Sequence, residues 1–104
     1  MSDVFLMHAD AETTAYFSEV ADALCALFGI PRAEAVARLN ARWGAVEFEP
    51  YPDLVCHEEP EHWAYLLYHG DVPYWEADAD RSAWPVLPPP PAGSPAWTAA
   101  PPQE

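Results

Sequence analysis

The chain has 104 residues and a formal net charge of −13, from 17 acidic residues, four arginines and no lysine. A chain of this length forms one small domain at most, and its few basic residues argue against binding to nucleic acid or to anionic membrane surfaces. No segment has the roughly 20 consecutive apolar residues that a membrane span needs, and the N-terminus has no basic leader, so we expect a cytoplasmic protein.

Two amphipathic helices are predicted in the N-terminal part of the chain, from apolar residues that recur at steps of three and four. The first spans about residues 10–28, where Asp10 is a suitable N-cap and Gly29 a suitable C-terminal end. Pro31 opens the second helix, which ends at Gly44. Because the link is so short, the two helices form an αα-hairpin. A DNA-reading helix-turn-helix has similar elements, but the acidic chain would repel phosphate.

A short antiparallel β-hairpin is predicted next. Residues 45–49 alternate apolar and acidic side chains, residues 54–57 begin with an apolar run, and the prolines between them favour a turn. A third helix is predicted at about residues 60–69, with Pro60 in its first turn and Gly70 after its end. The predicted fold class is therefore α+β, mainly helical.

The composition changes after a predicted acidic domain at residues 1–80. Eight of the 13 prolines lie in residues 85–102, so residues 81–104 are predicted to form a flexible, disordered Pro-rich tail with polyproline-II character. Trp84 is expected to anchor this tail to the domain. Its P-x-x-P spacing is a pattern that aromatic grooves bind, which raises the hypothesis of an accessory subunit that docks through the tail.

The acidic charge is concentrated in residues 43–80, which carry ten acids and no base. Such a field speeds encounter with a basic partner, and tyrosine and tryptophan are favoured anchors at interfaces. The plainer interpretation is that the acids keep a small protein soluble. The predicted partner-binding residues are Glu47, Glu49, Tyr51, Asp53, Glu58, Glu59, Glu61, Tyr65, Tyr68, Asp71, Tyr74 and Trp75.

The segment between His57 and His62 resembles a metal-binding motif. The zinc motif H-E-x-x-H needs histidines four residues apart on one helix, whereas these are five apart with Pro60 between them. A looser site formed by His57, Glu61 and His62 is the alternative, which would make the protein a small metal-dependent enzyme. The leading expectation is no bound metal and no cofactor.

Motifs for covalent catalysis are absent from the sequence. Cys25 and Cys56 do not make a disulfide framework and are expected to be buried thiols, although one bridge between them stays open. The four glycines are scattered and form no phosphate-binding loop, and no serine lies in a nucleophile motif. We therefore assign no catalytic residues.

The leading hypothesis is a non-enzymatic, acidic protein-binding module, either an inhibitor or an immunity-type protein for a basic partner. In charge and size the chain resembles small acidic inhibitors of basic toxins, such as bacterial immunity proteins. This resemblance is one of composition, covers no motif and assigns no residues. The composition, rich in alanine and proline and free of lysine, is typical of bacteria with a high genomic GC content.

Overall fold

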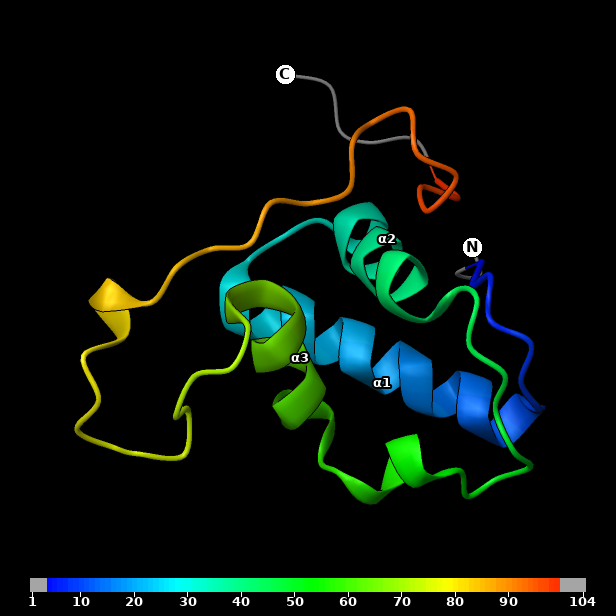
Figure 1. Ribbon diagram of the computed structural model, residues 1–104, viewed down its shortest axis with the longest axis horizontal. Helices are drawn as coiled ribbons and strands as arrows, with labels where there is room; N and C mark the ends of the chain where they lie inside the picture. The colour runs from blue at the N-terminus through cyan, green and yellow to red at the C-terminus, as the bar shows by residue number, and fades with distance from the viewer. Residues whose placement is uncertain (1–3, 100–104) are drawn as a thin grey trace.

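Helices are the main elements of the computed structural model, which describes residues 4–99 (Figure 1). In chain order the elements are α1 (Ala11–Phe28), α2 (Arg32–Trp43), the 3₁₀-helix η1 (Leu54–His57), α3 (Pro60–His69) and the 3₁₀-helix η2 (Arg81–Ala83). The three predicted α-helices are confirmed, each within a residue or two of its expected bounds.

The ends of α1 follow from two residues that the sequence marks. The Asp10 side chain accepts a hydrogen bond from the backbone N–H of Thr13 at 3.0 Å, which satisfies one of the unpaired donors of the first turn. Gly29 has φ 67° and ψ 20°, a left-handed conformation that costs a side-chain-bearing residue free energy. The helix therefore stops where only glycine fits easily.

The core is built around α1, which packs against both α2 and α3. Phe17 is fully buried at its centre, with ring centroids 5.8 Å from Trp43 and 5.1 Å from Phe48. Phe5, from the segment before α1, contacts the same ring at 5.9 Å. Offset and edge-on ring contacts of this kind add to the free energy of burial. One aromatic residue of α1 thus joins three separate segments.

The helices α2 and α3 touch each other much less than either touches α1. Arg38 of α2 donates a hydrogen bond to the Leu67 carbonyl oxygen, and Trp43 packs edge-on against Trp63 at 5.3 Å. These pairings show that α2 and α3 run antiparallel. Their limited contact leaves a hollow between them, which is described below.

The predicted β-hairpin is wrong. Within residues 4–99 the only β-type pairing is an isolated parallel bridge between His8 and Glu47. Residues 54–57, predicted as a strand, form η1 instead, because the Asp53 side chain caps the turn by accepting the Val55 N–H at 2.9 Å. Such local side-chain bonds compete with ladder formation. The described chain is therefore helical, and α+β is corrected to an all-α fold.

The predicted disorder of the Pro-rich tail is wrong for residues 85–99, which cross α2 (Figure 1). The Leu87 N–H donates to the Tyr68 carbonyl oxygen at 2.8 Å, and the Trp97 indole N–H donates to the Pro90 carbonyl oxygen at 2.8 Å. Ala96 is only 4% exposed. Burial and hydrogen bonds therefore hold this part of the segment, although its composition suggests otherwise.

Other predictions about organisation are tested only in part. Residues 100–104, the end of the predicted tail, lie outside the described residues, and the division near residue 80 stays a prediction. None of the helices in the described range has the length and apolar character needed to cross a bilayer.

The thiol of Cys56 is free. Burial raises its pKa above the ordinary value.

Candidate functional site

The predicted partner-binding residues are spread along the length of α1. Near its N-terminus, the Tyr51 N–H donates to Asp10 Oδ2 at 2.8 Å. Near its C-terminus, Tyr65 packs edge-on against Phe28 at 5.4 Å between ring centroids. An 18-residue helix is roughly 27 Å long, so Tyr51 and Tyr65 lie far apart on the molecule.

Near the N-terminus of α1, the predicted residues belong to the loop before η1. Glu47, Glu49 and Tyr51 are exposed. Asp53 is half-buried, and its carboxylate accepts backbone N–H groups from Glu49 at 2.7 Å and from Val55 at 2.9 Å. Both oxygens of Asp53 thus stabilise the loop itself.

Three exposed carboxylates surround the start of α3, beside the N-terminal half of α1. Glu58, Glu59 and Glu61 lie close enough to Tyr74 to act on its hydroxyl. Burial raises the pKa of Tyr74 above its ordinary value, and these three negative charges raise it further. The Tyr16 hydroxyl of α1 donates to the Glu58 carbonyl oxygen at 2.6 Å and so fixes the position of this turn. The acids thus form a local cluster on a defined backbone.

Aromatic rings lie beside this acidic cluster. Tyr65 and Tyr74 are stacked at 4.8 Å with an interplanar angle of 7°, and Trp75 meets Tyr74 edge-on at 5.3 Å. Trp84 packs edge-on against Tyr65 at 6.1 Å. Trp75 is 68% exposed, which is unusual for so large an apolar side chain. We call Tyr65, Tyr74, Trp75 and Trp84 the aromatic platform.

Arg81, which is not among the predicted site residues, lies against this platform. Its guanidinium carbon is 5.5 Å from the ring centroid of Tyr65 and 4.8 Å from that of Trp84, within the range of cation–π contacts. The same group donates to the Tyr65 hydroxyl at 3.0 Å and to the Tyr74 carbonyl oxygen at 2.7 Å. The spacing of Arg81 and Trp84, three residues apart, is the signal that was available in the sequence.

Of the last two predicted residues, only Tyr68 lies apart from the platform. Tyr68 is half-buried, stacked on Phe28 at 4.1 Å and covered by the Arg38 guanidinium at 5.0 Å from its ring centroid. Asp71 is exposed in the turn after α3 and lines a small cavity with Tyr74 and Trp75. The structure therefore brings seven of the twelve predicted residues together. These seven are Glu58, Glu59, Glu61, Tyr65, Asp71, Tyr74 and Trp75.

The alternative metal site does not assemble in the described part of the chain. There, no group of three or more histidine, cysteine, aspartate or glutamate side chains is placed to hold an ion. His62 Nδ1 instead lies 3.1 Å from the Tyr74 hydroxyl, with a Glu58 carboxylate oxygen 3.8 Å away. His57 is exposed at the end of η1. The structure thus supplies no donor set for the metal-dependent enzyme hypothesis.

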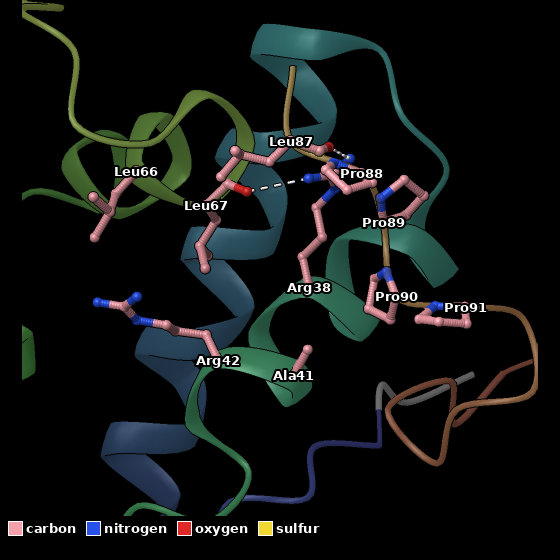
Figure 2. Close-up of a pocket in the computed structure, with 10 residues that line it drawn as sticks. All are labelled: Arg38, Ala41, Arg42, Leu66, Leu67, Leu87, Pro88, Pro89, Pro90 and Pro91. Carbon is pink, nitrogen blue, oxygen red and sulfur yellow. Dashed lines mark hydrogen bonds between the residues drawn. The ribbon is translucent and has the colours of Figure 1, made fainter. Parts of the chain in front are cut away.

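A separate concave region lies where α2 and α3 diverge. A cavity of about 410 Å³ is bounded by α2, by α3 and by the extended segment from Leu87 to Pro91 (Figure 2). A second cavity of about 410 Å³ lies towards η1, lined by Trp43, Val46, Phe48, Leu54 and other residues. Arg42 lines both cavities. We call the two together the α2–α3 groove.

Comparisons of this chain with models of protein families, with curated proteins and with solved structures found no match. Any proposal about the function of this chain therefore rests on the chemistry of its own surface residues.

Proposed function

We propose that the protein is a non-enzymatic, acidic protein-binding module that recognises arginine side chains of a basic partner. The recognition surface consists of the aromatic platform and the three carboxylates beside it. An inhibitor or immunity-type role towards a basic protein is the form of this function that the charge and size favour.

The contact made by Arg81 is the observation that supports this proposal most strongly. It is a guanidinium group within cation–π distance of two aromatic rings, with hydrogen bonds to one hydroxyl and one carbonyl oxygen. The residue is exposed, so the contact forms at the surface and not in the core. A partner arginine would meet the same rings and acceptors, and Arg81 serves as an internal example of the ligand.

The surrounding charge favours a cationic partner over a neutral one. The segment from residue 43 to residue 80 carries a net charge of −10, and Glu58, Glu59 and Glu61 adjoin the platform. Carboxylates at the rim of an interface raise association rates with positively charged proteins and make binding sensitive to salt. The exposed ring of Trp75 supplies apolar area of the kind found at interface hot spots.

The test is a titration of the full chain with three short peptides that alternate glycine with arginine, lysine or glutamine. Tryptophan fluorescence reports binding at low and at high salt. We expect the arginine peptide to bind most tightly, since guanidinium stacks on aromatic rings better than ammonium does. Trp75→Ala should weaken this binding about tenfold. Arg81→Gln should strengthen it, because the variant vacates the platform.

A matched pair of variants separates a specific site from general acidity. Glu58→Gln with Glu61→Gln should weaken binding of the arginine peptide. Glu47→Gln with Glu49→Gln, which removes the same charge in the loop before η1, should have little effect. Equal effects of the two pairs, or equal binding of the arginine and glutamine peptides, would contradict the proposal.

A further inference from the structure

Arg42 stands out among the arginines because of its surroundings. Arg32 is paired with Asp22, Arg38 with Glu34, and Arg81 with the platform. Arg42 is exposed, and no described residue gives it a hydrogen bond, an ion pair or a ring contact. Its guanidinium is therefore not engaged by any carboxylate among the described residues.

The walls around Arg42 are mostly apolar. On one side, Ala41, Leu66, Leu67 and Leu87 line the first cavity together with a run of four prolines. Figure 2 shows Arg42 extending away from those prolines, on the side where Leu66 of α3 lies. The groove is thus mostly apolar, and two arginines line it. Arg38 is paired with Glu34, whereas Arg42 has no charge partner among the described residues.

The second cavity continues this apolar surface towards η1. Leu54 at its edge is 79% exposed, and Val46 is 44% exposed. Asp53 also lines this cavity, but its oxygens accept the N–H groups of Glu49 and Val55. The carboxylate of Asp53 is therefore partly satisfied within the loop and does not pair with Arg42.

We propose that the α2–α3 groove binds a small apolar carboxylic acid, with the carboxylate on Arg42 and the hydrocarbon part between the helices. Cavities of a few hundred cubic ångström that are mostly apolar and carry a few polar groups are typical of small-molecule sites. A guanidinium forms charge-assisted, bidentate hydrogen bonds with a carboxylate. The fit of ligand charge to the one unpaired arginine distinguishes an acid from an alcohol or an amine of the same length.

The net charge of the protein makes the test stringent. A chain with a charge of −13 repels anions in general, so a preference for an acid must come from a local cation. The probes are octanoate and octan-1-ol, which share a hydrocarbon chain and differ in charge. Each is titrated into the full protein, and backbone amide shifts in NMR spectra report both the affinity and the residues that respond.

We expect octanoate to bind about tenfold more tightly than octan-1-ol, with shifts in α2, α3 and residues 87–91. Arg42→Gln should remove this preference and leave octan-1-ol binding unchanged. Leu54→Glu should also weaken octanoate binding, and the exposure of this side chain means that the variant keeps its fold. Arg81→Gln, which removes an arginine from the platform, is the control and should bind octanoate as the parent protein does.

Equal affinities for octanoate and octan-1-ol in the parent protein would overturn this proposal, as would an Arg42→Gln variant with unchanged octanoate binding. Saturable binding that shifts only residues outside the groove would do the same. The result is independent of the arginine-peptide titration, because Arg42 and the aromatic platform lie in different parts of the molecule.

Discussion

The Arg38 guanidinium donates a hydrogen bond to the Leu87 carbonyl oxygen at 2.9 Å, across 49 positions of sequence. Its other terminal nitrogen donates to the Leu67 carbonyl oxygen at 3.1 Å, and the group is paired with Glu34. Figure 2 shows the guanidinium between these two carbonyl groups. A single buried side chain of α2 thus holds the end of α3 and the start of the proline run.

Replacing Arg38 should be strongly destabilising. Arg38→Gln leaves Glu34 without its charge partner and two carbonyl oxygens without their donor, at a cost of about 3 kcal/mol in the free energy of unfolding. Urea unfolding followed by circular dichroism measures this loss. The exposed Arg42→Gln is the matched control and should change stability by less than about 0.5 kcal/mol. Similar losses in both variants would show that Arg38 does not have this role.

Asn40 should connect the two ends of the described chain. Its side-chain oxygen accepts the Leu6 N–H at 2.8 Å, and its nitrogen donates to the Ala96 carbonyl oxygen at 2.9 Å. Asn40→Ala leaves the Leu6 N–H and the buried Ala96 carbonyl oxygen without these partners and should cost about 2 kcal/mol. Hydrogen exchange at the Leu6 amide should become faster than global unfolding. Thr98→Val, which removes one exposed hydrogen bond to Val4, should cost less than about 1 kcal/mol.

Asp10 should make stability depend on pH in the acid range. Hydrogen bonds from the N–H groups of Tyr51 and Thr13 lower the pKa of this carboxyl below its unfolded value. A depressed pKa in the folded state means that the stabilisation is present above the unfolded pKa. It is lost as the pH falls through the folded pKa, below about pH 4.

The measurement is the melting temperature between neutral and acid pH. Asp10→Asn keeps an oxygen acceptor but has no titratable charge, so its melting temperature should fall less steeply below about pH 4 than that of the parent protein. Parallel curves for the two proteins would show that other carboxyls cause the acid dependence.

Gly29 should tolerate alanine less well than Gly93 does. At Gly29 a Cβ atom meets nothing within 4 Å, so the cost arises from φ 67° alone and should be about 1 kcal/mol. Gly93 has equally open surroundings without a positive φ, and its alanine variant should lie within about 0.5 kcal/mol of the parent protein. Thermal melts of the two variants compare backbone strain directly. Equal melting temperatures would remove the left-handed cap as the reason for glycine at position 29.

Some features were predictable because their signals are local. The Asp10 cap, the Pro60 start and the Gly29 and Gly70 ends lie within one helical turn of the element they delimit. Part of the candidate site was predictable for the same reason, since Glu58, Glu59 and Glu61 are close together in the sequence. Tyr74 is distant from these three acids in the sequence, and the turn after α3 brings it close to them in space.

Other features could not be read from the residues alone. The alternation in residues 45–49 is typical of a strand, but a strand needs a partner, and Asp53 turns the following segment into η1. The contact of Arg81 with Tyr65 needed the path of the chain after α3, which no spacing rule gives. The omission of Arg81 comes from an interaction between distant segments, whereas the wrong hairpin comes from a local cap that competes with the strand pattern.

By itself, the sequence determined the three helices and the concentration of negative charge in residues 43–80, because caps, apolar periodicity and formal charge are properties of neighbouring residues. Only the tertiary structure decided that residues 85–99 pack on α2, that Glu58, Glu59 and Glu61 lie beside Tyr74, and that Arg42 lies in a mostly apolar groove. These outcomes depend on which buried donors and acceptors find partners across the fold, and a composition rich in proline carries no information about that pairing.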